Sequence, residues 1–569
     1  MCKRFRTKIG LLFVSFAKTF YFCSPKPYAI PMKKIVRHAF LLMAFLAVLP
    51  VCADNAEVKM KITSRYLNFP VSHQTERRAL SLRVKGRKAD VPYCRSVVRL
   101  TEGEPDYWVF QDVSDLKGKT VILSFDGSDE ALRRVYQADT FPGEAMLYRE
   151  TYRPQYHFTT RRGWMNDPNG LVYDATRDEY HLFYQHNPFE REWENMHWGH
   201  AVSHDLIHWS ELPEALHPDD LGTIFSGSAW MDGERMIVFY TSDSPEAERQ
   251  CMAVSTDGGR TFTKHAGNPV IDSHLRWQSH DTRDPKLFRY GGDEEHWVLV
   301  LNERDGHTIY TSTNLTDWTP QSHITGFWEC PELFPLGDRW VMWGASGTYM
   351  VGQFDGYTFT PSGPKQMNLN GSAYAAQCFN QMPDGRVVKM AWGRIGFPDM
   401  PFNGCMLLPQ EQTLRPTPQG LRLYSYPAAE CEHLFTRVFD VHDVSAAEAN
   451  TLLLPWNGND CLRIKATLHL TYATGISLRY RGQNLFDYDM NGNRLQGEFY
   501  ANPLTPGSMD VELDLYIDRT IVEGYVDGGA FSYSFQRDVR SRNGDGYQFH
   551  GNELQIRHLE VFEPQSIWQ

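Results

Sequence analysis

A repeat in the middle of the chain constrains the fold more than any other feature of the sequence. Between residues 155 and 410, a short aromatic or apolar run recurs five times, at intervals of about 50 residues. The runs lie at 180–185, 236–241, 297–301, 340–344 and 387–392. Runs of this length, rich in aromatic and β-branched residues, are typical of β-strands.

A second element follows the first four runs, at 203–209, 255–262, 312–318 and 354–359. Each copy reads as a strand end, an Asx-type turn and an aromatic residue that fills the gap between two sheets. Five such units with several strands each predict a five-bladed β-propeller. An irregular sandwich is the alternative, and four turn motifs in phase with the runs disfavour it.

Three carboxylates occupy related positions in this repeat. The first strand of a propeller blade lines the central channel, and here it should lie about a dozen residues before each run. Asp167, Asp284 and Glu329 precede the first, third and fourth runs in this way, and Ser226 precedes the second. The three acids are therefore predicted to converge on one axial pocket, although they are far apart in the sequence.

Converging carboxylates suit glycoside hydrolysis, in which one attacks the anomeric carbon and another protonates the leaving oxygen. Glu329 stands between Trp328 and Cys330, which predicts an apolar wall around a carboxyl that must hold a proton. A Ca²⁺ site is the rival use of three acids, but no EF-hand spacing is present. Taken alone, residues 166–170 read only as a turn, and Arg283 with Asp284 as a structural ion pair.

Four motifs carry a family resemblance. Trp-Met-Asn-Asp-Pro-Asn-Gly at 164–170, Phe-Ser-Gly-Ser at 225–228, Arg-Asp-Pro at 283–285 and Glu-Cys-Pro at 329–331 resemble glycoside hydrolase family 32. That family includes invertases, exo-inulinases and levanases. The segments 184–188, 195–201 and 518–523 are also similar to it, so that the resemblance covers residues 156–569.

The resemblance implies an all-β chain, with a five-bladed propeller followed by a C-terminal β-sandwich. It implies hydrolysis of β-fructans or sucrose, with retention, through a fructosyl-enzyme intermediate. Asp167 would be the nucleophile, Glu329 the acid/base and Asp284 the stabiliser of the transition state. The residues that would hold the fructosyl unit are Trp164, Asn166, Gln185, Trp193, Phe225, Ser226, Arg283 and Trp392. No cofactor and no metal ion are implied.

The sequence departs from the family pattern at three places. Ser372 or Ala373 stands where the fifth blade usually carries an acid, Glu332 stands where Asp is commoner, and Gln410 replaces an arginine. None of these departures removes a catalytic carboxylate. They leave open the preference among levan, inulin and sucrose.

The flanking segments complete the predicted domain organisation. Residues 1–53 are a leader with a secretory signal, 54–150 a small N-terminal β-module, 151–412 the propeller and 413–569 the sandwich. The signal has a basic start at Lys33 and Lys34, an apolar stretch at 39–51 and a cleavage end at 51–53, so Met32 is the expected true start. The stretch is too short to span a membrane. Export to the periplasm, the cell surface or the medium follows, and a lipoprotein anchored at Cys52 is the alternative.

Charge and side-chain chemistry exclude several function classes. The formal net charge is −12 and no basic tract is present, so a nucleic-acid partner is not expected. The seven cysteines after residue 53 form no CxxC pair, which disfavours a disulfide scaffold or zinc ribbon. Histidines 197, 200, 204 and 208 lie in a strand–turn–strand pattern and share no helical face. Ser226 and Ser228 lack the GxSxG context of a serine nucleophile.

The sequence leaves several functions open. Trp193 and residues 195–199 would close a pocket around a terminal fructose, which favours exo-action over endo-action. Fructosyl transfer uses the same intermediate with a sugar acceptor in place of water. A non-catalytic fructan-binding protein and a pentosan hydrolase on the same scaffold are further alternatives. Three aligned acids disfavour the binding protein, and the motif at 164–170 disfavours the pentosan hydrolase. The oligomeric state is not readable from the sequence.

Overall fold

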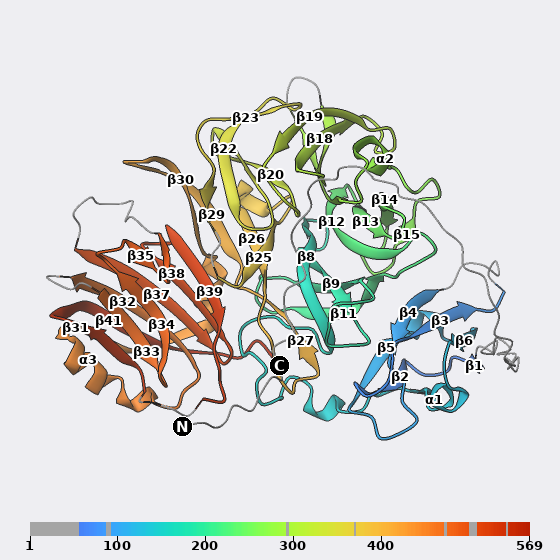
Figure 1. The fold of residues 1–569 in the computed structure, drawn as a ribbon, viewed down its shortest axis with the longest axis horizontal. Helices are drawn as coiled ribbons and strands as arrows, with labels where there is room; N and C mark the ends of the chain where they lie inside the picture. Colours follow the sequence, from blue (N-terminus) through green and yellow to red (C-terminus); the bar gives the residue numbers. More distant parts are fainter. Residues whose placement is uncertain are drawn as a thin grey trace, which may run out of the picture. The chain divides into compact units, whose positions relative to one another are not determined.

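The computed structural model describes residues 56–86, 93–291, 295–368, 371–470, 475–499, 509–541, 544 and 546–568. They belong to one compact unit, Ala53–Gln569, which is mostly β (Figure 1). The predicted signal and Cys52 lie outside the described residues. None of the helices described is long and apolar enough to cross a membrane.

Two small sheets share one apolar core in the first part of the chain, drawn in blue in Figure 1. Their strand orders are β1-β6-β3-β4 and β5-β2-β7, and we call them together the N-terminal module. In β3 and β6, buried residues alternate with more exposed ones, as a sheet with one packed face requires. The strands are β1 (Ala56–Lys61), β2 (Tyr66–Val71), β3 (Arg78–Val84), β4 (Cys94–Val98), β5 (Tyr107–Asp112), β6 (Thr120–Phe125) and β7 (Tyr136–Ala138). Short helices are η1 (Ser114–Leu116), α1 (Asp129–Arg133) and η2 (Glu144–Met146).

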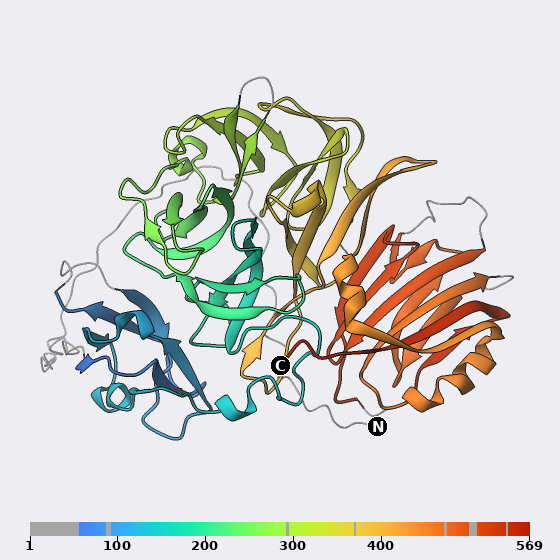
Figure 2. The same cartoon turned by 180° about the vertical axis from the view of Figure 1, so that it is seen from behind.

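Five antiparallel sheets follow, each with its strands mostly in chain order. They run from teal to orange in Figures 1 and 2. Sheet 1 is β8 (Gly163–Asp174), β9 (Glu179–Asn187), β10 (His197–Ser203) and β11 (Ser210–Leu216); sheet 2 is β12 (Thr223–Asp232), β13 (Arg235–Asp243), β14 (Glu248–Ser255) and β15 (Thr263–Lys264). Sheet 3 is β16 (Thr282–Tyr290), β17 (His296–Glu303), β18 (Gly306–Ser312) and β19 (Thr319–Thr325). Sheet 4 is β20 (Glu332–Leu336), β21 (Arg339–Trp343), β22 (Thr348–Phe354) and β23 (Phe359–Pro361), with β24 (Gln366–Met367). Sheet 5 is β25 (Ala373–Cys378), β26 (Val387–Gly393), β29 (Gln410–Thr417) and β30 (Gly420–Pro427), with β28 (Cys405–Met406). Helices α2 (His274–Trp277) and η3 (Pro383–Gly385) lie between strands.

The second strands of these sheets are the apolar runs of the sequence repeat, and the turn motifs fall where the pattern predicted them. Asp205, Asp257, Asn314 and Asp355 each accept backbone N–H groups two to four residues ahead. Such Asx turns let the chain reverse without leaving its backbone donors unsatisfied. The repeat seen in the sequence is therefore a repeat of structure.

Apolar clusters join each sheet to the next. A further cluster joins sheet 5 to sheet 1, where Phe379 and Val388 pack with Leu171 and Tyr180. The strand β27 (Phe402–Asn403), which lies between β26 and β28 of sheet 5 along the chain, pairs in parallel with β8 of sheet 1. The first and last sheets are thus held together by both apolar packing and backbone hydrogen bonds.

Buried polar side chains link the first strands of the sheets. Gln377 of β25 accepts from the Leu171 amide at 3.0 Å and donates to the Gly227 carbonyl at 2.9 Å. The Lys286 ammonium of β16 lies 3.0 Å from Glu332 of β20, with both side chains almost fully buried. A buried charge pair is tolerated only when both partners are in place, so this pair fixes the spacing of sheets 3 and 4. Glu332, unusual for the family, is thereby explained as a packing residue.

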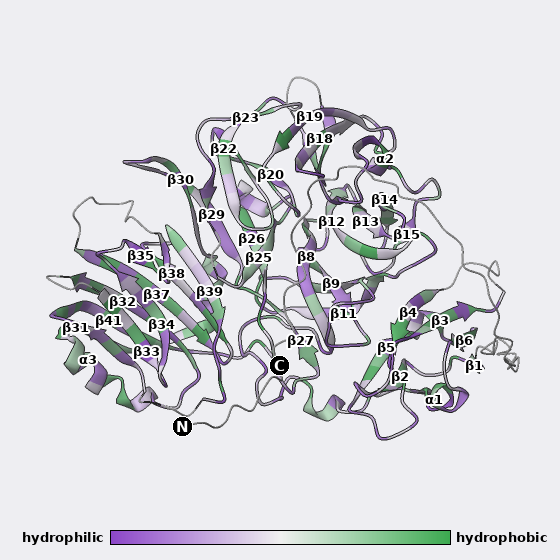
Figure 3. Cartoon of the chain, viewed as in Figure 1, coloured by the Kyte–Doolittle hydropathy of each residue, from purple (hydrophilic) through white to green (hydrophobic). Residues whose placement is uncertain are grey.

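Two sheets at the end of the chain enclose one large apolar core. One is β31 (Phe435–Ser445), β41 (Leu554–Pro564), β32 (Cys461–Leu470), β37 (Asp510–Asp518), β38 (Ile521–Val526) and β39 (Phe531–Gln536). The other is β36 (Glu498–Phe499), β35 (Arg494–Leu495), β34 (Gln483–Asp489), β33 (Gly475–Tyr480) and β40 (Gln548–Gly551). The helices are η4 (Ala429–Leu434), α3 (Ala446–Leu452) and η5 (Leu454–Trp456). Polar and apolar residues alternate along many of these strands (Figure 3).

The 518–523 motif joins these sheets to the start of sheet 1. Asp518 accepts from the His157 ring at 2.8 Å, and Glu523 contacts the other ring nitrogen at 2.8 Å. All three side chains are buried. The motif therefore ties the C-terminal sheets to the segment that leads into sheet 1.

Two strand boundaries bear on the extent of sheet 5 and on the place of Glu329. Sheet 5 extends through β30 to Pro427, past residue 412, because the hairpin of β29 and β30 pairs with β26. Glu329 lies in the connection before β20, which begins only at Glu332. The positive φ angles of Glu329 and Cys330 prevent the strand from starting earlier.

Candidate active site

The first strands of sheets 1, 2 and 3 carry a β-bulge at the candidate residues. The pairing of β8 with β9 shifts between Met165 and Pro168, where Asp167 stands. The pairing of β16 with β17 shifts between Arg283 and Lys286, and that of β12 with β13 around Ser226. A bulge bends the strand and redirects a side chain. A β-bulge thus takes Asp167, Ser226 and Asp284, which are equivalent residues of three sheets, out of the regular strand pairing.

The backbone is strained at two of the three acids. Asp284 has a φ of 65° and Glu329 a φ of 51°, and Cys330 follows with a φ of 40°. Positive φ is uncommon for residues other than glycine and costs of order 1 kcal/mol or more each. Such strain persists only where surrounding contacts enforce it. Here Asp284 accepts from the Cys330 N–H, and the Glu329 N–H donates to Asn302 Oδ1 at 2.8 Å.

Cys330 connects the acids. Its backbone N–H donates to Asp284 Oδ2 at 2.9 Å. Its thiol lies 3.6 Å from Asp167 Oδ2 and 3.7 Å from Asp284 Oδ2, so its single hydrogen can be donated to either carboxylate. Because Glu329 is the preceding residue, all three acids predicted from the repeat meet at this point of the fold.

Asp167 is held by neighbours from two sheets. The Ser226 hydroxyl donates to its Oδ2 at 2.9 Å, and the Asn166 amide donates to its Oδ1 at 3.2 Å. Asn166 in turn accepts from the Trp164 indole N–H at 2.8 Å. The Trp164 and Trp392 rings lie edge to face, with centroids 5.7 Å apart. Two predicted binding residues therefore contact the predicted nucleophile, and two more are linked to it through Asn166.

Glu329 has polar neighbours. Its Oε1 accepts from the Arg283 guanidinium at 2.8 Å, and its Oε2 accepts from the Tyr374 hydroxyl at 2.5 Å. Its side chain is 25% exposed. The expected apolar wall is absent because Trp328 is itself exposed, with Arg283 stacked over its ring at 5.2 Å. A fixed cation and a phenol take its place around this carboxyl.

Burial changes the proton affinity of the other two acids. It raises the pKa of Asp167, against the lowering effect of the Asn166 and Ser226 hydrogen bonds. It raises the pKa of Asp284 to about 7, with Arg283 opposing the shift and the Glu329 and Asp167 carboxylates adding to it. Burial beside these acids also raises the pKa of the Cys330 thiol, so that the thiol stays protonated and able to donate.

Three further predicted residues lie beside this group. Trp193, in the loop after β9, is half exposed, and its ring meets Phe225 edge to face at 6.0 Å. Phe225 directly precedes Ser226 in β12. Gln185 of β9 is buried and donates from its side-chain amide to the Ile224 carbonyl at 2.9 Å. Gln185 is thus tied to the backbone that carries Phe225.

Two residues of the site were not predicted. Tyr374 lies in β25 within the stretch 371–377, which the sequence marked only as lacking the usual acid. Cys330 lay inside a recognised motif but had no role of its own. The signal for Tyr374 was available, since it stands about a dozen residues before the fifth apolar run, as the three acids do before theirs.

Three groups of side chains have the ligand spacing of a metal site among the described residues, and none includes the three acids. Of histidines 197, 200, 204 and 208, only His197 belongs to one, with Cys94 and His217. His200 contacts His181 at 3.0 Å, and His208 contacts Asp205 at 2.7 Å. The four histidines therefore do not share a site.

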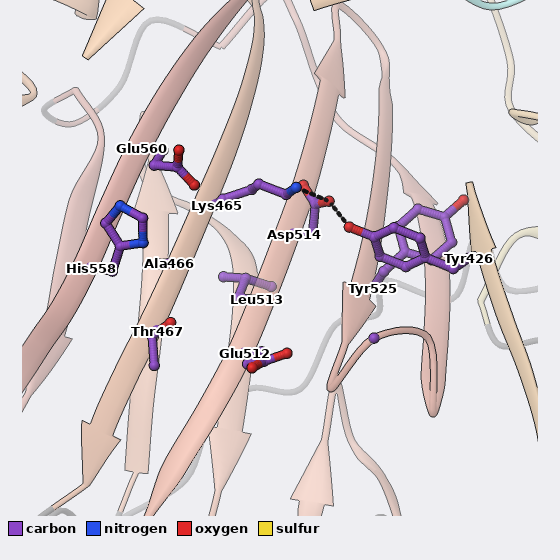
Figure 4. A pocket seen from close by; sticks show the side chains of 11 residues that line it. Tyr426, Lys465, Ala466, Thr467, Glu512, Leu513, Asp514, Tyr525, His558 and Glu560 are labelled. Carbon is purple, nitrogen blue, oxygen red and sulfur yellow. Dashed lines mark hydrogen bonds and ion pairs between the residues drawn. The ribbon is translucent and has the colours of Figure 1, made fainter. Parts of the chain in front are cut away.

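A separate hollow of about 210 Å³ opens on the six-stranded sheet of the C-terminal part (Figure 4). Its polar lining includes Lys465, Asp514 and Glu560. Asp514 is already engaged, because it accepts from the Tyr426 hydroxyl and lies 2.8 Å from Arg463. This hollow contains none of the candidate catalytic residues.

Comparison with known proteins adds to this geometry. Residues 157–427 match the family described as the glycosyl hydrolases family 32 N-terminal domain. A levanase of Bacillus subtilis (strain 168) is 33% identical over 507 residues, which cover 77% of this chain and 74% of the levanase. An extracellular exo-inulinase of Aspergillus niger is 30% identical, over 69% of this chain and 90% of its own length. The crystal structure of exo-inulinase from Aspergillus awamori has a TM-score of 0.62 and 25% identity, over 74% of this chain and 100% of that one.

Proposed function

Because the chain belongs to glycoside hydrolase family 32, we propose that it releases fructose from β-fructans or sucrose with retention at the anomeric carbon. The chain is a glycosidase that hydrolyses fructosides. The observation that carries the proposal is the convergence of Asp167, Asp284 and Glu329 around Cys330.

The first step forms the fructosyl-enzyme. The Asp167 carboxylate attacks the anomeric carbon of the terminal fructosyl unit, and the bond from that carbon to the glycosidic oxygen breaks. The departing oxygen takes the proton from Glu329. Hydrogen bonds from Ser226 and Asn166 favour the ionised form of Asp167 against its burial.

The second step releases fructose. Glu329, now a carboxylate, takes a proton from water, and the water oxygen attacks the same carbon. The bond to Asp167 breaks, which restores the nucleophile and leaves Glu329 protonated. Asp284 stabilises the positive charge that develops on the sugar in both transition states, and that charge in turn favours its ionised form.

The residues that hold the fructosyl unit follow from their contacts. We assign the aromatic wall to Trp164, Trp392, Trp193 and Phe225, which lie in two edge-to-face pairs. The polar positions are Asn166, Gln185, Ser226 and Arg283. Arg283 has two roles, because besides binding the sugar it donates to Glu329 at 2.8 Å and so fixes that carboxyl.

Replacing Tyr374 by Phe is expected to lower kcat about tenfold, since a hydrogen bond to a charged acceptor contributes roughly 1.5–3 kcal/mol. Burial and the Glu329 carboxylate raise the pKa of the phenol, so it remains a donor at working pH. Steady-state kinetics on sucrose test this, with the exposed Tyr136→Phe as control. An unchanged kcat would remove Tyr374 from the site.

We propose the following architecture for this function. The five sheets form a five-bladed propeller that extends to Pro427, a β-sandwich follows, and residues 54–150 form an N-terminal β-module. The cluster and strand pairing between sheets 5 and 1 support closure of the propeller. Residues 1–53 would direct export to the periplasm, the cell surface or the medium. The extracellular exo-inulinase among the relatives supports export.

Exo-action is the mode that the site supports best, because Trp193 and Phe225 stand as a wall beside the acids. Incubation with levan, inulin and sucrose, followed by chromatography of early products, is the test. We expect free fructose as the sole early product from the fructans. A ladder of oligosaccharides would indicate endo-action, and longer oligomers made from sucrose would indicate transfer. Binding without turnover of any of the three would overturn the assignment.

A further inference from the structure

We propose that the N-terminal module positions Trp193 at the active site by clamping the loop of residues 188–196 through Arg77. This 188–196 loop joins β9 to β10 and carries Trp193 near its middle. The inference rests on the proposed function, because Trp193 matters only if it walls the sugar pocket. It gives a role to a module whose sequence indicated none.

The loop is inserted into the core of the module. Phe189 is 1% exposed and belongs to the apolar cluster formed by the two sheets of the module. Its ring meets Phe69 of β2 edge to face, with centroids 5.5 Å apart. Burying a phenylalanine side chain is worth roughly 1.5–3 kcal/mol, so the start of the loop is fixed by the module.

The end of the loop pairs with an edge strand of the module. The Asn195 side chain accepts from the Val97 N–H at 2.7 Å and donates to the Val97 carbonyl at 2.8 Å. Val97 lies in β4, the last strand of its sheet. The Asn195 side-chain amide therefore makes the two hydrogen bonds to Val97 that a neighbouring strand would make, at an edge that would otherwise remain open.

Arg77 holds the stretch between these two anchors. Its guanidinium lies 2.7 Å from Glu190, 2.9 Å from Glu192 and 3.4 Å from Glu194. The three glutamates alternate along the loop and flank Trp193 on both sides. One planar guanidinium with several donors can hold carboxylates in a fixed fork, which an ammonium cannot.

The charges show why the loop depends on this contact. Glu190 is almost fully buried, and its other cationic neighbour, Arg99, lies farther away at 3.4 Å. Without Arg77, a buried carboxylate would be largely uncompensated and three like charges would repel one another. The loop would relax by moving outward, and Trp193 would move with it.

Hollows lie on both sides of the loop. One of about 340 Å³ is lined by Trp193, Asp243 and His280. The other, of about 420 Å³, is lined by Arg191 together with His73 of the module. Trp193 itself is half exposed and contacts Phe225 only at a ring edge. Its place is therefore set chiefly by the backbone of the loop, and so by the module.

The test compares wild type with Arg77→Ala on sucrose and on a fructan. We expect KM to rise about tenfold with a smaller change in kcat, since displacement of a binding wall weakens substrate capture more than chemistry. Hydrogen–deuterium exchange of a peptide spanning the loop should accelerate about tenfold. Arg78→Ala is the matched control, because Arg78 pairs with the exposed Glu76 on the module surface and not with the loop among the described residues.

A double-mutant cycle separates positioning from general stability. Trp193→Ala alone should raise KM, and adding Arg77→Ala to it should change KM no further. A further rise equal to the effect of Arg77→Ala alone would overturn the proposal. So would a lower melting temperature with unchanged KM, because that is the result expected of a merely structural contact.

Glu192→Gln combined with Glu194→Gln keeps the test decisive if Arg77→Ala fails to fold, since both glutamates are partly exposed. We expect a KM rise of about threefold from this variant, and an unchanged KM together with unchanged exchange would contradict the clamp. Loop exchange does not depend on turnover. A wild type inactive on all fructosides would overturn the proposed function, while the exchange experiment still decides whether Arg77 fixes the loop.

Discussion

Asp167→Ala is expected to lower kcat by about 10⁴-fold or more while leaving the fold intact, because it removes the atom that bonds to the sugar. Among the described residues Asp167 makes no ion pair, and two of its partners keep other contacts, Asn166 with the Trp164 indole and Cys330 with Asp284. Its burial costs stability rather than adding to it. The melting temperature should therefore stay equal to or above that of the wild type, and Asp178→Asn, on an exposed turn of the same sheet, is the control.

Glu329→Ala separates the two roles. It should also lose most activity. On a fructoside whose leaving group needs no protonation, added azide should restore turnover and yield fructosyl azide, because azide needs no general base to attack the intermediate. Azide should not rescue Asp167→Ala with the same stereochemical outcome, since no intermediate can form there. Azide rescue of Asp167→Ala but not of Glu329→Ala would refute the assignment of nucleophile and acid/base. Normal activity of Asp167→Ala would refute it as well.

The positions of these acids were predictable because a structural repeat leaves a periodic record. Asp167 and Asp284 stand at fixed distances before apolar strands, and bulged first strands carry both. Glu329 was located equally well, but its surroundings were not. The contacts of Arg283 and Tyr374 with Glu329 join sheets 3 and 5 to the connection before β20, and no local pattern encodes such a meeting.

The clamp on the 188–196 loop illustrates the same limit more strongly. The alternation of Glu190, Glu192 and Glu194 in the sequence gives no sign of a buried partner, since charged residues are mostly exposed. Their common partner, Arg77, lies more than a hundred residues earlier in a module with no recognisable motif. Contacts of this kind depend on how two cores pack, and only the folded chain shows them.

Asp284→Asn is expected to stabilise the folded protein at neutral pH while it abolishes most activity. Burial raises the pKa of Asp284 to about 7, against a value of 3.8 in an exposed carboxyl. Between these values the folded state binds more protons than the unfolded state, so stability falls as pH rises from about 4 to 7. About three pKa units at 1.4 kcal/mol each set an upper bound of roughly 4 kcal/mol for this loss. The side-chain amide of the Asp284→Asn variant carries no charge, so burying it does not cause this loss of stability.

The pH dependence of unfolding distinguishes this origin from a local packing change. Denaturant unfolding of wild type and Asp284→Asn should differ little at pH 4 and by about 2–4 kcal/mol at pH 8, with Asp338→Asn, an exposed aspartate, unchanged throughout. Equal differences at both pH values would mean that titration of Asp284 is not the cause. Activity should fall about 100-fold or more, because the neutral amide cannot balance the positive charge of the transition state. The site therefore keeps a carboxylate whose burial destabilises the fold, and that cost is the expected sign of a residue retained for catalysis.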